Sequence, residues 1–235
     1  LSDLALLLGV IAGYDAGDSD TRPFAVPDFR AFAEEDFPIE PRFGFVRTPV
    51  WDKAEPDAQR AFEQLADMLG DNCIRIDLPP EYADAWDIHR TIMIAEMAHN
   101  LGEIVDRGGV GVSEVLRKLV GEGRQVSAVA YQRALDEARQ LTDSLAGYFQ
   151  HCNAFITPAT TGVAPQGLDA TGNPVFCSMW TLSGLPSLSL PLLTGESGLP
   201  IGVQVVGAPL DDARLIRSAN WLIGKLEPKG KRKKA

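Results

Sequence analysis

Long apolar runs are missing from this sequence, and cysteine is scarce. The longest apolar stretch covers residues 4–12, far short of the roughly 20 residues that a membrane-spanning helix needs. Cys73, Cys152 and Cys177 are odd in number and form no Cys-x-x-Cys pair, which is typical of a reduced protein. The sequence also lacks a charged segment followed by an apolar run and a cleavage site. These absences predict a cytoplasmic protein with no membrane partner.

Basic residues are also in short supply. The sequence holds 32 acidic and 22 basic residues, a formal net charge of −10. Five of the basic residues lie in 229–235, so residues 1–228 hold 17 basic residues against 32 acidic ones, a balance of −15. Such a body repels nucleic acids, which proteins bind through clustered Lys and Arg, so no nucleic-acid partner is predicted. The basic tail is either a small anion-binding patch or, as we expect, a solvated and disordered terminus.

Complete catalytic motifs are absent as well. The sequence has no Gly-x-Ser-x-Gly elbow, no P-loop, no Gly-x-Gly-x-x-Gly motif after a strand and no Cys/His cluster. His89 and His99 are ten positions apart and lack the i, i+4 spacing of a helical zinc site. Glu96 and His99 form one Glu-x-x-His pair, but a di-metal site in a helix bundle needs two such pairs. The sequence therefore predicts no metal site and no cofactor.

Cys177 is the one residue that we considered as a catalytic nucleophile. A cysteine nucleophile needs a neighbouring base, and only a histidine brought close by folding would supply one. The competing interpretation, which we favour, is an ordinary cysteine of a pocket or of the core. By its motifs alone, the sequence contains no complete active site.

The hydrophobic pattern that is present predicts an α/β protein. Alternating apolar residues mark strands, and apolar residues at helical spacing next to capping residues mark helices. The predicted strands are 42–47, 73–78, 154–157, 187–193 and 201–207, and the predicted helices are 2–12, 56–69, 82–106, 113–121, 127–150 and 211–226. Strand, helix and strand over 42–78 are typical of a parallel βαβ unit. Residues 15–42, rich in Pro, Asp and Phe, are predicted to be an irregular connection.

Two of these segments carry further predictions. The first predicted helix, capped by Ser2 or Asp3, is apolar nearly all round, so we expect burial on more than one side. Pro191 interrupts the fourth predicted strand with a residue that cannot donate to a β-ladder, which predicts an edge strand or a bulge. Residues 194–198 contain glycine and have the length of a hairpin turn between that strand and the next.

The stretch from 157 to 207 is dense in proline and glycine. It holds six prolines and eight glycines, which fix many backbone angles and permit close approaches between segments. Rigid loops at the edge of a sheet are where binding surfaces are usually built. This C-terminal third is therefore the predicted place of a binding surface.

Five short motifs in the same region resemble the C-terminal end of the amidase-signature family. In order along the chain they are 153–159 (NAFITPA), 167–174 (GLDATGNP), 180–191 (WTLSGLPSLSLP), 198–207 (GLPIGVQVVG) and 211–215 (DDARL). Each motif alone is a weak pattern, but the five follow one another in the order of the family. Residues 1–20 are similar to a segment in the middle of the same family, so the resemblance spans nearly the whole chain.

The resemblance implies a fold and an activity. The fold is a large mixed β-sheet flanked by helices on both faces. Family members hydrolyse carboxamide C–N bonds through an acyl-enzyme, using a serine nucleophile, a second serine and a lysine. This sequence has no Gly/Ser-rich run of that kind, and its first lysine, Lys53, lies outside any matching motif. The resemblance thus implies that residues 1–228 are the C-terminal portion of an amidase domain without its catalytic half, followed by the tail 229–235.

The resemblance also implies which residues contact a substrate. The C-terminal half of the family shapes the acyl side of the substrate pocket, and the matching loop here is 173–181. Asn173, Cys177, Trp180 and Thr181 are accordingly the candidate substrate-binding residues, although a place in the core is an equal alternative for Trp180. The expected ligand is a small-molecule amide, bound together with the missing N-terminal half.

Several interpretations of the whole protein follow. The start at Leu1, directly before a helix cap, predicts a truncated chain. Without the catalytic half, we expect the chain not to hydrolyse amides and to have exposed sheet edges and an uncovered apolar face. The motif at 167–174 favours a free-standing amidase, because the acidic residue that tRNA-dependent amidotransferase subunits carry falls near Pro174. A non-catalytic binding or regulatory module derived from an amidase is an alternative, as is a homo-oligomer whose copies complete each other's sheet.

Overall fold

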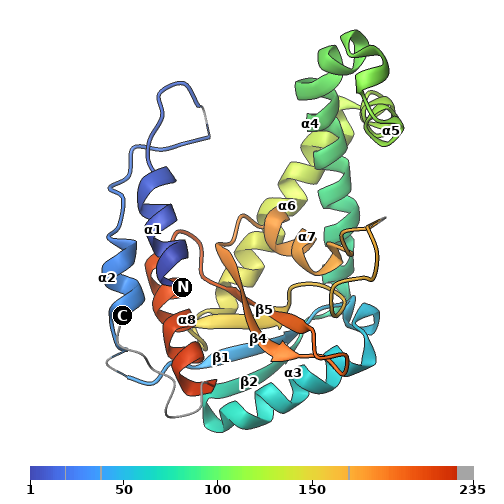
Figure 1. Cartoon of the computed structure of the whole chain (residues 1–235). Helices are drawn as coiled ribbons and strands as arrows, with labels where there is room; N and C mark the ends of the chain where they lie inside the picture. The colour runs from blue at the N-terminus through green and yellow to red at the C-terminus, as the bar shows by residue number, and fades with distance from the viewer. Residues whose placement is uncertain (19, 38, 169, 227–235) are drawn as a thin grey trace.

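The computed structural model describes residues 1–226 with the exception of 19, 38 and 169 (Figure 1). Its α-helices are α1 (Ser2–Ile11), α2 (Phe29–Glu34), α3 (Pro56–Leu69), α4 (Ala85–Arg107), α5 (Glu114–Gly123), α6 (Ala128–Tyr148), α7 (Val175–Leu182) and α8 (Asp212–Leu226). Its strands are β1 (Phe43–Arg47), β2 (Cys73–Asp77), β3 (Ala154–Pro158), β4 (Ser187–Thr194) and β5 (Pro200–Val206). Short 3-10 turns cover Trp51–Lys53, Gly70–Asn72, Pro80–Asp84 and Gly109–Gly111. The tail predicted over 229–235 lies outside the described residues.

In the described part of the chain, the strands form one mixed sheet in the order β2-β1-β3-β5-β4. β1 pairs in parallel with β2 and β3, and β5 pairs antiparallel with β3 and β4. β1, α3 and β2 follow one another along the chain, so the predicted βαβ unit is confirmed. β3 is buried along its whole length, because it lies in the middle of the sheet.

Hydrophobic cores fill the space on both faces of the sheet. On one face, Phe45 of β1 and Ile156 of β3 pack with residues of α1, α2, α3 and α8. On the other face, Val46 and Phe155 pack with residues of α4, α6 and α7. Neighbouring residues of a strand point to opposite faces, which is why 45 and 46 serve different cores. The predicted fold class, a mixed sheet with helices on both faces, is confirmed.

α4, α5 and α6 form a helical arm that extends away from the sheet (Figure 1). Ser113 Oγ accepts a hydrogen bond from Leu116 N at 3.2 Å, and Ser127 Oγ accepts one from Ala130 N at 3.1 Å. Both predicted caps are therefore confirmed. α5 lies so close to α4 that a Cβ on Gly123 would overlap the α4 backbone. Within the described residues, no helix has both the length and the apolar character that crossing a membrane requires.

The first helix differs from its prediction in two respects. Neither Ser2 nor Asp3 caps it, because the N-cap residue is Leu1, whose side chain forms no capping hydrogen bond. Burial on more than one side was also the wrong expectation, since within α1 only Ala5 is buried and Val10 is 77% exposed. α1 packs along α2 on one side, and the described residues leave much of its apolar surface uncovered.

Residues 15–42 were predicted to be an irregular connection, but they contain the helix α2. Asp28 caps this helix by accepting a hydrogen bond from Ala31 N at 3.1 Å. Phe29 is buried in the core, and Arg217 of α8 forms an ion pair with Glu35 at 2.7 Å. A helix of six residues has too little periodicity to stand out in a sequence, and its contacts with α8 supply the stabilisation.

The C-terminal strands confirm the predictions made for them. β4 and β5 form a hairpin in which Gly195 N donates a hydrogen bond to Leu199 O at 2.9 Å. β4 is an outer strand of the sheet, and its register with β5 shifts between Leu190 and Leu193. Pro191 therefore lies both on an edge strand and in a bulge.

Candidate substrate-pocket wall

The segment 173–181, predicted to be a loop that lines the pocket, is largely helical, so the predicted loop conformation was wrong. α7 begins after Asn173, whose Oδ1 accepts a hydrogen bond from Val175 N at 3.0 Å. Its buried residues share one helix face: Val175, Phe176, Met179 and Trp180. The local wealth of proline and glycine argues against a regular element, yet Pro174 occupies the N-cap, where it costs no helical hydrogen bond.

The four predicted pocket residues lie on different sides of α7. Trp180 is 1% exposed, and its ring centroid lies 5.8 Å from that of Phe155, so the structure places this indole in the core, the alternative that the sequence left open. Its Nε1 has no hydrogen-bond partner among the described residues. Asn173 and Thr181 are exposed at the two ends of the helix. The structure therefore sorts the four predicted residues into a core indole, a half-buried thiol and two exposed polar side chains.

Cys177 of α7 lies against the residue that follows β3. Its Sγ is half-buried and lies 3.2 Å from the carbonyl oxygen of Ala159. Burial raises the pKa of this thiol, and a hydrogen bond with Gln204 lowers it by less. A raised pKa disfavours the thiolate, which is the reactive form of cysteine, so these surroundings do not activate Cys177 as a nucleophile.

Polar side chains also gather beneath α7, at the carboxyl end of β3. Thr157 pairs in register with Gln204 of β5, and both residues are buried. With its amide nitrogen facing α7, Gln204 donates hydrogen bonds to Phe176 O and Pro158 O at 3.2 and 3.3 Å. Thr157 Oγ1 has no partner among the described residues. Because open α/β sheets bind ligands at the carboxyl ends of their strands, Thr157 is a candidate site residue that the sequence did not single out.

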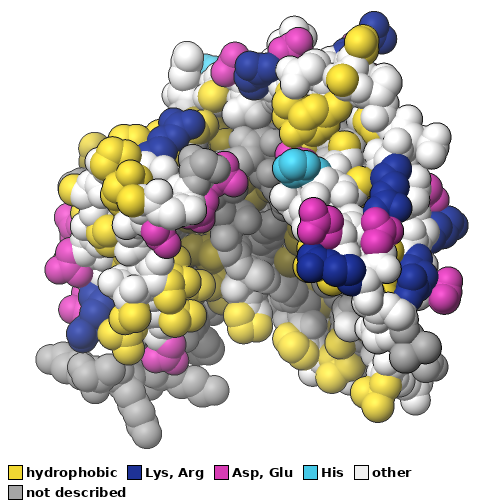
Figure 2. Space-filling view, turned by 90° about the horizontal axis from the view of Figure 1, so that it is seen from above, with side chains coloured by type: hydrophobic (Ala, Val, Ile, Leu, Met, Phe, Trp, Pro, Cys, Tyr) yellow, Lys and Arg dark blue, Asp and Glu magenta, His cyan; other side chains and the backbone are white. Residues whose placement is uncertain are grey.

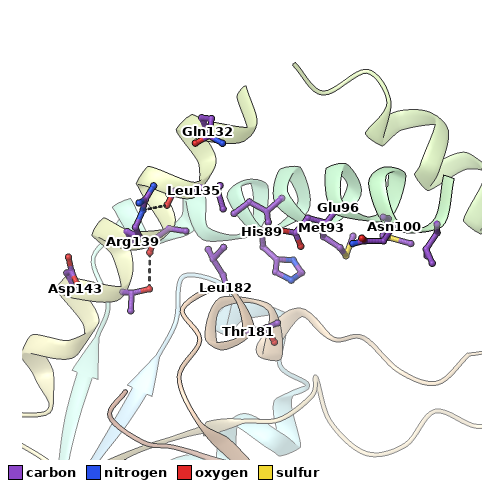
Figure 3. Close-up of a pocket in the computed structure, with 15 residues that line it drawn as sticks. His89, Met93, Glu96, Asn100, Gln132, Leu135, Arg139, Asp143, Thr181 and Leu182 are labelled. Atoms are coloured by element: carbon purple, nitrogen blue, oxygen red, sulfur yellow. Dashed lines mark hydrogen bonds between the residues drawn. The ribbon is translucent and has the colours of Figure 1, made fainter. Parts of the chain in front are cut away.

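A cavity of about 1040 Å³ opens beside Thr181, between α4, α6 and α7 (Figure 3). Its apolar lining comes from all three helices: Ile92, Met93, Met97, Leu101, Leu135, Ala138 and Leu182. The imidazole of His89 points into the space between α4 and α7. Burial lowers its pKa, so the ring is neutral at pH 7. No prediction from the sequence covered this cavity, although a second apolar stripe on α4, beside the buried one, was its signal.

The Glu-x-x-His pair on α4 takes part in other contacts. Glu96 Oε1 accepts a hydrogen bond from the Tyr131 hydroxyl at 2.9 Å, which links α4 to α6. His99 is exposed. Among the residues that the structure describes, no three potential metal ligands lie together.

Comparison with known proteins places the chain in a family. Residues 1–216 match the protein family described as Amidase. The chain belongs to the amidase family. A curated relative from Cereibacter sphaeroides, a glutamyl-tRNA(Gln) amidotransferase subunit, is 31% identical over 260 residues, covering 94% of this chain and 52% of the relative. The protein of the same name from Syntrophus aciditrophicus is 27% identical over 257 residues, covering 94% of this chain and 52% of the relative. This amidase-family chain spans about half the length of these relatives.

Solved amidase structures share the fold. The substrate complex of 6-aminohexanoate cyclic dimer hydrolase matches with a TM-score of 0.74 and 24% identity, covering 97% of this chain and 53% of that one. An inhibitor-bound complex related to the origins of an s-triazine catabolic enzyme matches with a TM-score of 0.80 and 21% identity, with the same coverage. A bacterial aryl acylamidase of the amidase-signature family matches at 0.69 and 16%, covering 95% and 51%. At these identities the likeness concerns the fold alone.

Proposed function

We propose that this chain is the C-terminal half of an amidase that hydrolyses carboxamide C–N bonds through a serine acyl-enzyme. The observation that carries this proposal is the match to the amidase family over residues 1–216. The chain spans about half of its relatives and contains no Gly/Ser-rich run with candidate catalytic serines. In this proposal the two serines and the lysine come from another segment, and this chain supplies the acyl-side wall of the pocket.

In the proposed reaction, the catalytic half makes and breaks the bonds and this chain positions the substrate. The serine oxygen of the catalytic half attacks the amide carbonyl, the C–N bond breaks, and the amine leaves with a proton delivered by the serine–lysine pair. Water then hydrolyses the acyl ester and restores the serine. The role proposed for Asn173, Cys177 and Thr181 is to hold the acyl group in reach of that serine, which contributes by lowering the entropy cost of attack. No bond forms or breaks on this chain.

An uncovered apolar surface on α1 supports an assembly of two halves. Leu6, Leu7, Val10 and Ile11 are between 52% and 77% exposed, and monomeric proteins rarely leave large contiguous apolar patches in water. Seen from above, the molecule is hollowed between the lobe that carries α1 and the helical arm (Figure 2). We propose that the catalytic half occupies this hollow, in contact with α1 and above α7.

We further propose that the complete protein is a free-standing amidase that acts on a small-molecule amide. The curated relatives are amidotransferase subunits, in which an acidic residue is expected near the pocket loop. In this chain that position falls near Pro174, which carries no charge and caps α7. The motif at 167–174 that favours this proposal includes Asp169, which lies outside the described residues.

Covalent labelling with a fluorophosphonate, which reacts with activated serines, tests the proposal. We expect neither labelling nor amide hydrolysis for the purified 235-residue chain. Co-expression with an amidase segment that carries the Gly/Ser-rich signature should give a complex in which the serine of that segment is labelled and amides are hydrolysed. Labelling and turnover by this chain alone would contradict the proposal.

The alternative function is a non-catalytic binding or regulatory module. It is favoured by the same absence of catalytic serines from the sequence. The co-expression experiment separates the two, because a module would bind an amide without supporting turnover in any complex. A complex that forms and binds amides but stays inactive would favour the module.

A further inference from the structure

The cavity beside Thr181 is lined by apolar side chains that the chain itself covers only in part. Met93, Met97, Leu135 and Leu182 line it and are half-buried. Half-exposed apolar groups gain free energy when a ligand removes them from water. The volume, about 1040 Å³, lies just above the usual range for small-molecule sites, which are mostly apolar with a few polar groups that fix orientation.

The polar groups at the cavity favour an uncharged ligand. His89, which points into the space (Figure 3), is neutral because burial lowers its pKa. Glu96 accepts a hydrogen bond from Tyr131. Arg139 is ion-paired within α6 at 2.6 Å, and Asp143, which also lines the cavity, is exposed. The two carboxylates repel an anion, and any charged group loses its hydration against the apolar walls, so the buried part of a ligand is favoured when it is uncharged.

The cavity and the proposed pocket wall have Thr181 in common. Thr181 and Leu182 form the C-terminal end of α7 and line the cavity. A ligand in contact with Thr181 can therefore extend into the cavity. Met93 and Met97 have unbranched, polarisable side chains that adapt to irregular shapes, so the site fits a class of apolar groups rather than a single one.

We propose that this cavity binds the aryl or alkyl portion of a neutral amide and thereby sets the substrate class of the enzyme. The role of this ligand as a substrate rests on the proposed function, whereas its binding to this chain does not. A second segment of protein covering the same apolar stripe is the competing occupant, and it predicts that small amides do not bind here.

The four methionines of the chain report on the cavity directly. Met93 and Met97 line it, Met179 is fully buried in the core, and Met68 of α3 is 66% exposed far from it in the fold. In a chain labelled with 13C at the methionine methyl groups, N-phenylhexanamide should shift the signals of Met93 and Met97 and leave the other two unchanged. Single Met→Leu substitutions assign the signals. Unchanged signals for Met93 and Met97 would overturn the proposal.

A ligand series tests the chemistry of the occupant. Lengthening the acyl chain from N-phenylacetamide to N-phenylhexanamide should tighten binding by up to about fourfold for each methylene that becomes buried. Replacing the terminal methyl of N-phenylhexanamide by a carboxylate should weaken binding about tenfold or more, because the charge is desolvated. Equal affinity for the charged and neutral compounds would overturn the assignment of an uncharged ligand.

Matched arginine substitutions on α6 test the location. Leu135→Arg brings a charge into the cavity and should weaken binding of N-phenylhexanamide about tenfold, while Val129→Arg, at a position 71% exposed on the same helix, should have no effect. Met97→Gln is the milder second variant, with an expected severalfold loss, and the unshifted Met179 signal checks that each variant is folded. Equal binding by Leu135→Arg and Val129→Arg would contradict the site. These experiments measure binding and no reaction. Their failure would therefore leave the serine-labelling result unaffected, and a failure of serine labelling would leave the binding results unaffected.

Discussion

Two hydroxyl side chains, those of Thr157 and Ser218, are completely buried but differ in their surroundings. Ser218 Oγ donates a hydrogen bond to Arg214 O at 2.8 Å, as serine often does inside a helix. Thr157 Oγ1 has no partner among the described residues. A buried polar group without a partner costs about 1–3 kcal/mol of stability, so Thr157 is a residue whose presence the folding of this chain does not explain.

The pair gives a stability prediction with an internal control. Thr157→Val keeps the shape of the side chain and removes the unpaired hydroxyl, so the free energy of unfolding should stay unchanged or rise by about 1 kcal/mol. Ser218→Ala removes a satisfied hydrogen bond and should lower it by about 1 kcal/mol. Urea unfolding of both variants provides the measurement. A large loss of stability in Thr157→Val would mean that the hydroxyl has a partner in the folded chain.

Cys152 gives a prediction of pH dependence. Burial raises the pKa of its thiol to about 12, whereas the thiol of the unfolded chain ionises near its ordinary value of about 8.5. The stabilisation from keeping this thiol protonated is complete below the unfolded value and is lost as pH rises toward the folded value. Between pH 8 and pH 10 the free energy of unfolding should therefore fall by about 1–2 kcal/mol more in the natural chain than in Cys152→Ala. Parallel pH profiles in urea unfolding would contradict the burial of this thiol.

At the level of secondary structure, α4 and α5 approach each other closely at Gly123. A Cβ on Gly123 would overlap the Ile94 carbonyl oxygen and lie 2.9 Å from the Ala98 Cβ, whereas a Cβ on Gly121, in the same helix, would meet nothing within 4 Å. Gly123→Ala should therefore destabilise the arm by about 2 kcal/mol or more, while Gly121→Ala should stabilise it by about 0.5–1 kcal/mol. Hydrogen exchange of the amides of α5 measures both effects. Similar protection in the two variants would show that α5 does not pack as described.

Elements with strong local signals were predicted from the sequence, and elements without them were not. α5 and α6 begin at Ser113 and Ser127 because a hydroxyl one residue before a helix satisfies a free backbone N–H. α7 was missed because eight residues between a proline and a glycine carry little periodic signal, and its burial against Phe155 is what stabilises it. The edge position and the bulge at Pro191 could be predicted, because a residue without an N–H cannot donate to a β-ladder in any fold.

At the scale of the whole molecule, the described residues leave an apolar surface of α1 uncovered, which predicts the behaviour of the chain in solution. Without the proposed catalytic half, the purified chain should self-associate as its concentration rises. The double variant Leu7→Ser/Val10→Ser should reduce this association and leave the free energy of unfolding nearly unchanged, because Leu7 is 58% and Val10 77% exposed. Sedimentation velocity measures the association, and Val115→Ser on α5, at a position 69% exposed, is the matched control.

The same variants connect this surface to the proposed function. Leu7→Ser/Val10→Ser should weaken the complex with a catalytic half in co-purification, because the apolar area that the complex would bury is reduced. Val115→Ser should leave the complex intact. Equal recovery of the complex with both variants would move the proposed interface away from α1.

The sequence by itself determined the α/β class, most helix and strand positions and the resemblance to amidases, because caps, proline positions and apolar alternation act over a few neighbouring residues. Only the tertiary structure decided the environments of individual side chains. It buried Trp180, left Thr157 without a partner among the described residues and exposed one side of α1. It also brought α4 and α6 together around a cavity. Those outcomes depend on distances between residues far apart along the chain, which no local pattern encodes.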